Sequence, residues 1–184
     1  MAARRIPAIL ISALCVAIPV LGTVSATGCS SGITEPTPTE DNRYLVPATI
    51  GGEKFVLETS LTDEQRRLGM GGREEIPEDR GMVFAFPASR KGVQRFYMAG
   101  CLVDIDIAYV DDSGRVTKMY TMPKEPPRGE DETLDEYIAR LPLYSSGVPV
   151  RYAVELKAGT LRRLGVKEGD RIEMDWEWLK EMAR

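Results

Sequence analysis

Apolar and polar residues alternate along several short stretches of the chain, most regularly in DIDIAYV, residues 104–110. Isoleucine and tyrosine occupy one face of this stretch and two aspartates the other, which is the period of a half-buried strand. Turn-forming residues follow at 111–114, because glycine and Asx residues favour tight turns, and residues 115–122 return as a second strand. The pattern predicts a β-hairpin at the centre of the fold.

The same reasoning predicts more strands and a few short helices. The further strands are expected at 44–50, 54–59, 82–86, 93–98, 150–157 and 171–176. Capping boxes at Thr62 and Thr133 predict two short helices, and Thr160 is expected to cap one more helical turn. Pro47 lacks an amide donor and places the first strand at an edge. We expect a mainly β protein with short helices, folded as a single compact antiparallel β-barrel or β-sandwich-like domain.

The N-terminal region has the layout of a secretory signal. Arg4 and Arg5 precede the uncharged run 6–24, and the small residues 26–28 precede Cys29. The segment 26–29 resembles the lipobox of bacterial lipoproteins, although Ala26 stands where leucine is usual. This resemblance implies a cut before Cys29 and acylation of that residue, while ordinary cleavage and an uncleaved anchor stay open as alternatives.

These features divide the chain into three parts. Residues 1–28 are expected to be a signal peptide, residues 29–43 a lipid-attached flexible linker rich in Ser, Thr and Pro, and residues 44–184 the β-rich globular domain. The domain would then be extracytoplasmic, anchored to a membrane through its N-terminal lipid on the periplasmic side of the cell envelope.

Composition removes several classes of function. The sequence contains no histidine, which excludes Ser-His-Asp and Cys-His nucleophile systems and every histidine-containing zinc site. The formal net charge is −4 without a basic cluster, and this argues against nucleic acid as a partner. We expect no metal and no cofactor, because the acids at 104–112 lack the spacing of a calcium loop.

A series of motifs in fixed order resembles the bacterial and archaeal family called domain of unknown function 192. These motifs are LET, DEQRRLGM with a following Arg, GMVFAF, FYM, LVDIDIAYVDDSGRV, YSS and RYAVELKAG with LGV and GD. The resemblance spans 44–176 and implies a small β-rich domain, often behind a signal peptide, with no established activity. The family usually has Lys-Asn-Thr after its aromatic-Met pair, whereas this chain has Ala99-Gly100-Cys101, and its segment 123–141 is longer than usual.

Three carboxylates interrupt the apolar strands and point away from their apolar neighbours, namely Glu58, Asp106 and Glu155. One interpretation treats them as scaffold, on a solvated face or paired with Arg66 and Arg73. The other interpretation places them around a pocket that binds a small polar ligand, where arginine provides bidentate recognition and an aromatic side chain provides a stacking face. Its ligand-binding residues would be Glu58, Arg66, Arg73, Tyr97, Met98 and Asp106.

No catalytic residue is assigned, because no nucleophile and base stand at a recognisable spacing. Cys101 is the one thiol expected in the mature chain, and a small buried role is favoured over a reactive one. The sequence therefore favours a membrane-tethered binding or interaction module, for a small polar or glycan-like ligand. A carboxylate-based envelope hydrolase and a structural module for an envelope protein partner are the alternatives.

Overall fold

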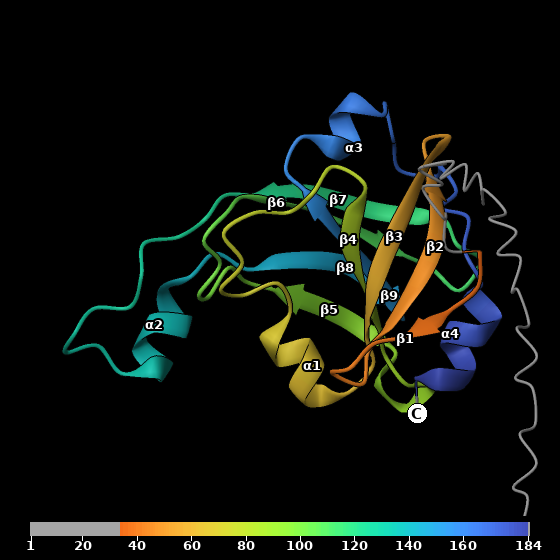
Figure 1. The fold of residues 1–184 in the computed structure, drawn as a ribbon. Coiled ribbons are helices and arrows are strands. Elements are labelled where there is room, and N and C mark those ends of the chain that lie inside the picture. The colour runs from red at the N-terminus through yellow and green to blue at the C-terminus, as the bar shows by residue number, and fades with distance from the viewer. Residues whose placement is uncertain (1–33, 184) are drawn as a thin grey trace, which may run out of the picture. The chain divides into compact units, whose positions relative to one another are not determined.

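The computed structural model describes residues 34–183, and a seven-stranded sheet forms most of this region (Figure 1). The expected signal peptide and the lipidation site at Cys29 lie outside the described residues. In spatial order the strands are β1 (Thr37–Pro38), β2 (Tyr44–Ile50), β3 (Glu53–Ser60), β4 (Arg80–Ala85), β9 (Tyr152–Lys157), β6 (Ile105–Val110) and β7 (Val116–Met122).

The sheet is mixed and curls into a half-barrel. β3 and β4 run parallel, while every other pair of neighbours in the sheet is antiparallel. The expectation of an antiparallel sheet is therefore wrong at this pair, and the reason is the connection. Residues 61–79, which include α1 (Asp63–Leu68), carry the chain back to the starting edge, as parallel neighbours require. The two outermost strands, β1 and β7, do not pair, so the sheet is not a closed barrel.

A separate two-stranded sheet packs against one face of the main sheet. It consists of β5 (Gly92–Phe96) and β8 (Tyr144–Val150), which pair antiparallel. Tyr109 of β6 and Tyr120 of β7 donate hydrogen bonds to the carbonyl oxygens of Tyr144 and Ser145, at 2.5 and 2.8 Å. Edge-to-face ring contacts also join the two sheets, including Phe96 with Tyr109 at 5.8 Å. The arrangement is sandwich-like on this side.

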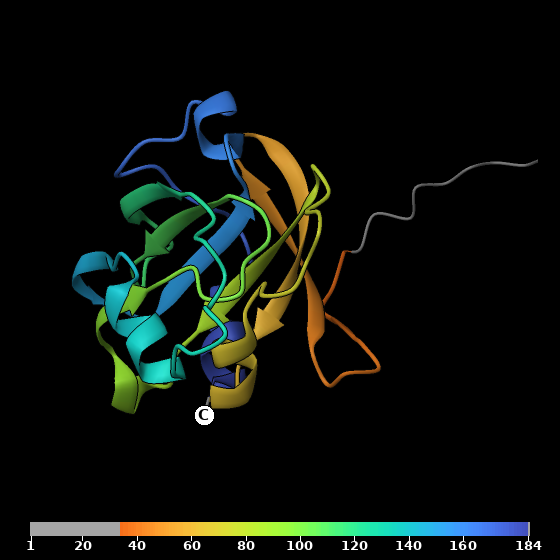
Figure 2. The same cartoon turned by 90° about the vertical axis from the view of Figure 1, so that its left-hand side faces the viewer.

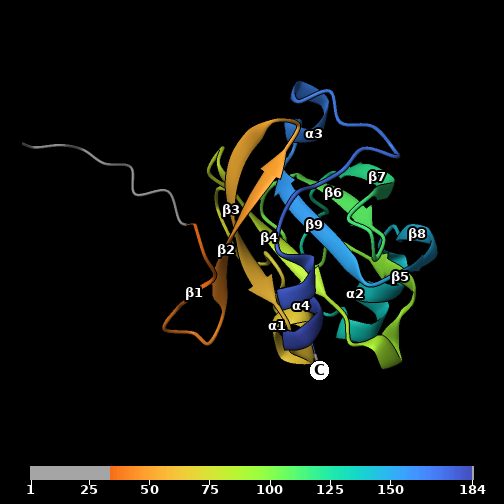
Figure 3. The same cartoon turned by 90° about the vertical axis from the view of Figure 1, so that its right-hand side faces the viewer.

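Short helices and loops cover the opposite face. α3 (Thr160–Arg163) contributes Leu161 to this second core, and α4 (Trp176–Met182) contributes Leu179, both almost fully buried. α4 lies beside β2 and β9, with the ring of Trp178 5.0 Å from that of Tyr44 (Figure 3). Because both faces are covered, β6 is buried at every position, rather than half-buried as its alternation predicts.

The long segment between β7 and β8 carries α2 (Leu134–Arg140) and extends from the end of the sheets (Figures 1 and 2). Its Tyr137 is buried, and the phenol accepts a hydrogen bond from the amide of Gly100 at 3.4 Å. Within residues 34–183, no helix has both the length and the apolar character needed to cross a membrane.

Local signals predicted most elements well. The capping boxes at Thr62 with Gln65 and Thr133 with Glu136 are confirmed, and so is the strand over 44–50. Pro47 faces no strand partner on its outer side, because β1 pairs only with the first two residues of β2. Besides the antiparallel pairing and the half-buried β6, two expectations about single elements are wrong.

The first error concerns residues 171–176, which make two isolated bridges to Thr49 and Arg115 and not a strand. The second concerns α3, whose N-cap is Gly159 and not Thr160. Residues 37 and 38 of the expected linker pair with β2 as β1.

Close packing of the sheet generates a stability prediction at Gly81 of β4. A Cβ atom there would lie 2.4 Å from the carbonyl oxygen of Glu155 and 2.7 Å from the Cδ2 atom of Leu156. Backbone cannot move aside cheaply within a sheet, so we expect Gly81→Ala to lower the free energy of unfolding by about 3 kcal/mol in urea denaturation. Gly92→Ala is the control, since its Cβ meets nothing closer than 3.9 Å. Equal stability of the two variants would contradict this packing.

Candidate functional site

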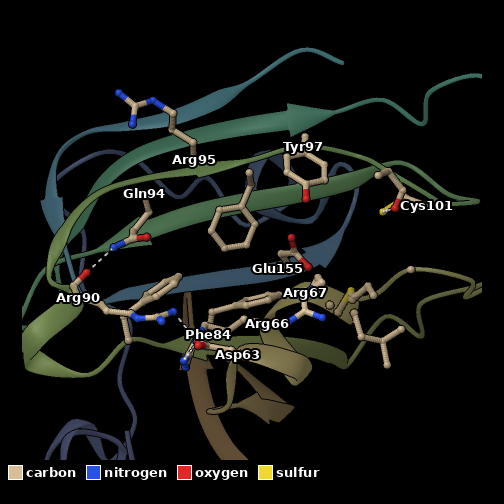
Figure 4. Close-up of a pocket in the computed structure, with 17 residues that line it drawn as sticks. Asp63, Arg66, Arg67, Phe84, Arg90, Gln94, Arg95, Tyr97, Cys101 and Glu155 are labelled. Atoms are coloured by element: carbon tan, nitrogen blue, oxygen red, sulfur yellow. Dashed lines mark hydrogen bonds and ion pairs between the residues drawn. The ribbon is translucent and has the colours of Figure 1, made fainter. Parts of the chain in front are cut away.

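A cleft of about 370 Å³ opens between α1 and β5, with β4 and β9 at its floor (Figure 4). Such a volume is within the range of small-molecule sites. Three phenylalanine rings and Tyr97 give it an apolar wall, while arginines and two acids supply polar groups. The residues discussed below that line it are Asp63, Arg66, Arg67, Phe84, Phe86, Arg90, Arg95, Phe96, Tyr97, Ala99, Cys101 and Glu155.

Glu155 lies on the cleft floor because of its register in β9. It stands between Met82 of β4 and Ile107 of β6, on the face that packs against β5 and β8. The side chain is 5% exposed, and no described residue gives it a hydrogen bond or an ion pair. Burial raises the pKa of its carboxyl to about 8, and the charge of Arg73 only partly opposes this rise. Glu155 is therefore a neutral carboxylic acid near pH 7, directed into the cleft.

Asp63 holds two of the cleft arginines. Its Oδ1 accepts hydrogen bonds from Arg66 at 2.6 Å and from Arg90 at 2.5 Å. The hydrogen bond from Arg66, with the charge of Arg90, holds the pKa of this exposed carboxyl below its usual value. Arg66 also donates to the carbonyl oxygens of Leu61 and Ala85 and stacks over a phenylalanine ring. Both arginines are thus part of the cleft wall.

Arg67 differs from these two. It is exposed at the cleft mouth, and no described residue accepts a hydrogen bond from its guanidinium. Figure 4 shows Glu155 near the centre of the view, with the hydroxyl of Tyr97 on one side and Arg67 on the other. Arg95 also lines the cleft, but its head group points away from the centre. The cleft therefore offers one unpaired cation, one neutral acid and one phenol to an occupant.

Glu58 and Arg73 form a bidentate ion pair beside the cleft. The two nitrogen–oxygen distances are 2.7 and 2.6 Å, and both side chains are about one-third exposed. Glu58 shares its row of the sheet with Met82 and Glu155. The hydrogen bonds to Glu58 raise the pKa of Arg73, and the bidentate geometry of the pair matches the scaffold interpretation.

Asp106 and Met98 lie apart from the other predicted ligand residues. Asp106 faces the opposite side of the sheet, where it is buried and accepts hydrogen bonds from the amide of Leu161 at 2.9 Å and the hydroxyl of Thr121 at 2.7 Å. It borders a second cleft there, also of about 370 Å³. Met98 is 1% exposed and belongs to the core. Of the six predicted residues, the structure brings Arg66 and Tyr97 to the first cleft.

Sequence reasoning singled out Glu155 as an acid within an apolar strand but left it out of the predicted pocket. The missing information was the pairing of β9 between β4 and β6, which alternation within one strand cannot reveal. Arg67 carried no distinguishing signal, because one more arginine in a charged helix is usually solvated.

Cys101 lines the same cleft with Ala99, at the positions where the chain departs from the Lys-Asn-Thr pattern. Burial, with the charge of Glu155, raises the pKa of the Cys101 thiol to about 11. The thiol is therefore protonated near pH 7 and a poor nucleophile. Among residues 34–183, no group of three or more His, Cys, Asp and Glu side chains is arranged to hold a metal ion.

Comparison with known proteins places the chain in a family. The model of DUF192, described as "Uncharacterized ACR", matches residues 46–174, which is most of the domain. The chain belongs to the DUF192 family. No curated protein matches it.

Two solved structures of bacterial proteins have a similar fold. One, from Sinorhizobium meliloti 1021, carries the provisional label of a transcription regulator. It is 25% identical, with a TM-score of 0.56, over 73% of this chain and 94% of that one. The other is a protein of unknown function from Novosphingobium aromaticivorans DSM 12444. It is 23% identical, with a TM-score of 0.59, over 80% of this chain and 98% of that one.

The state of Glu155 generates a pH prediction for this DUF192 domain. Its folded pKa of about 8 exceeds the ordinary value of 4.5. The native state therefore holds a proton that the unfolded state has lost, and stability declines as pH rises from about 4.5 to 8. We expect the free energy of unfolding to fall by about 5 kcal/mol through this group, and Glu155→Gln to remove that part of the decline.

Urea denaturation at a series of pH values measures the effect. Glu130→Gln, a substitution at an exposed acid of the 123–143 segment, is the matched control and should keep the wild-type profile. An unchanged profile in Glu155→Gln would show that the acid is solvated or paired.

Proposed function

We propose that the domain is a binding module that holds a small polar ligand in the cleft over Glu155. One observation carries this proposal: a carboxyl group 5% exposed, without a hydrogen-bond partner among the described residues, is directed into a cleft large enough for a small molecule. Buried polar groups are normally hydrogen-bonded, and leaving one unpaired costs about 1–3 kcal/mol. A ligand that pairs with Glu155 would supply the hydrogen bond that no described residue gives it.

The surroundings of Glu155 support recognition. Tyr97 offers a hydroxyl, Arg67 offers an unpaired guanidinium, and phenylalanine rings offer flat apolar faces. A few convergent polar groups on an apolar wall are typical of small-molecule sites. The fixed hydrogen bonds of Arg66 keep one wall rigid, so the site needs little ordering when a ligand enters.

A carboxylate hydrolase is less well supported. The raised pKa of Glu155 suits a general acid, but a glycosidase also needs a second, ionised carboxylate across the substrate. The other acid that lines the cleft is Asp63, and two arginines already occupy it. The binding role therefore agrees better with the charges of this cleft.

We also propose that the domain acts outside the cytoplasm, tethered to a membrane through an acylated Cys29. The support is the order of a positive start, an apolar run and a small-residue lipobox in residues 1–29. The linker then joins the domain at β1, the outer edge of the sheet (Figure 3).

Native mass spectrometry of the full chain, taken from its own membranes in mild detergent, tests the ligand. We expect a fraction of the protein to carry a small-molecule adduct that is lost from Ala99→Trp, because the indole would fill the cleft. Gly92→Ala, outside the cleft, should retain the adduct. Retention of the same adduct by Ala99→Trp, with wild-type melting temperature, would place the ligand elsewhere.

The same preparation tests the anchor. The intact mass should equal that of residues 29–184 plus the acyl groups of a lipoprotein, and Cys29→Ala should lose the acyl mass. A mature N-terminus at another residue, or an unmodified Cys29 thiol, would contradict lipidation.

A further inference from the structure

We infer that the occupant of the cleft is a small organic anion, with a carboxylate head and a flat apolar body. This inference rests on the proposed binding function and adds the chemical class of the ligand. It follows from three independent features of the cleft: its charge balance, the shape of its wall, and the hydrogen-bonding groups that point into it.

The charge balance is positive. Asp63 neutralises only one of the two arginines that it binds, so the trio with Arg66 and Arg90 carries one excess positive charge. Arg67 adds another at the mouth. The Glu58–Arg73 pair beside the cleft is internally neutral. An anion gains free energy in this field and a cation loses it, and the low polarity of the cleft strengthens both effects.

The wall is suited to a flat body. Phe96 meets Phe84 edge to face at 4.9 Å and Phe86 at 6.4 Å, and all three rings border the cleft. Rings held at such angles present faces and edges against which a planar group packs. Arg66, 5.3 Å above the Phe86 ring, already covers one ring face and leaves the others for the ligand.

The polar groups are suited to a carboxylate head. A neutral Glu155 donates its acid proton, Tyr97 donates its hydroxyl proton, and Arg67 donates its guanidinium hydrogens; a carboxylate accepts all three. Arginine binds carboxylates through paired, charge-assisted hydrogen bonds. A ligand amine could form an ion pair with Glu155 only if Glu155 lost its proton. The positive charge of Arg67 would also repel the amine.

The affinity of the cleft for an anion should also depend on pH, through the protonation of Glu155. The charged and titratable groups around Glu155 come from α1, the loop after it, β6 and the segment after β5: Arg67, Arg73, Tyr109, Tyr97 and Cys101. Of these, the arginines stay charged, and burial raises the pKa values of Tyr109 and Cys101 away from neutrality. Ionisation of Glu155 above pH 8 is thus the event that adds a repulsive charge beneath the ligand.

Three probes of one shape test the class of ligand: benzoate, benzamide and benzylamine. The protein used is isotope-labelled residues 29–184. Changes in its amide chemical shifts on titration with each probe give the dissociation constant at about pH 6.5 and about pH 9. We expect benzoate to bind at least tenfold more tightly than benzamide at the lower pH, with shifts confined to α1, β5 and β9. Benzylamine should not bind there. Benzoate should weaken about tenfold at the higher pH.

Two variants locate the interaction. Arg67→Gln should weaken benzoate about tenfold and leave benzamide unchanged, while Arg162→Gln is the control, because this exposed arginine of α3 borders the second cleft on the opposite side of the sheet. Glu155→Gln should abolish the pH dependence.

The outcomes separate this inference from the proposed function. If benzamide or benzylamine bound in the cleft as tightly as benzoate, the inference of an anionic ligand would be wrong. The proposed function as a binding module would still stand. Shifts elsewhere on the surface, or none with any probe, would overturn both. Equal loss in Arg67→Gln and Arg162→Gln would show that only the net charge of the protein matters, and this would also overturn the inference.

Discussion

The main sheet is buried on both faces, and this constraint decides the state of each carboxylate within its central strands. Asp106 meets it with hydrogen bonds from an amide and a hydroxyl. Glu58 meets it with a bidentate arginine at the edge of the packed region. Glu155 has neither hydrogen-bond donors nor an arginine partner among the described residues, and it keeps its proton instead. Three acids that look alike in sequence therefore have three different physical roles.

The aromatic contacts between the two sheets explain why this unpaired acid is tolerated. Ring contacts run from Phe84 through Phe96 and Tyr109 to Tyr120, and they fix β5 and β8 over the face that carries Glu155. Glu155 is therefore only 5% exposed, and the cleft is the open part of its surroundings. The cleft is the gap where this second sheet does not reach α1.

Residue patterns predicted the parts of the fold that depend on neighbours in sequence. The two capping boxes, the hairpin of β6 and β7 and the class of fold follow from alternation and turn chemistry. The parallel pair of β3 and β4 and the covering of both faces depend on long-range pairing, which alternation does not encode. Arg66 and Tyr97 lie at the cleft, whereas Asp106 faces the other side of the sheet, because alternation along β6 places it opposite Ile105 and Ile107. The identity of the cleft floor depended on the same pairing.

The junction at Arg43 has a mechanical consequence. Its guanidinium is buried and bonds to the carbonyl oxygen of Thr59 at 3.1 Å, while β1 before it pairs through only two residues. A force applied along the N-terminal segment would first peel β1 from its neighbour at small extension. The load would then reach Arg43 and the interior of the sheet, where further lengthening requires the whole domain to unfold. The N-terminal segment would therefore yield a short length of chain under load before the core of the domain is disturbed.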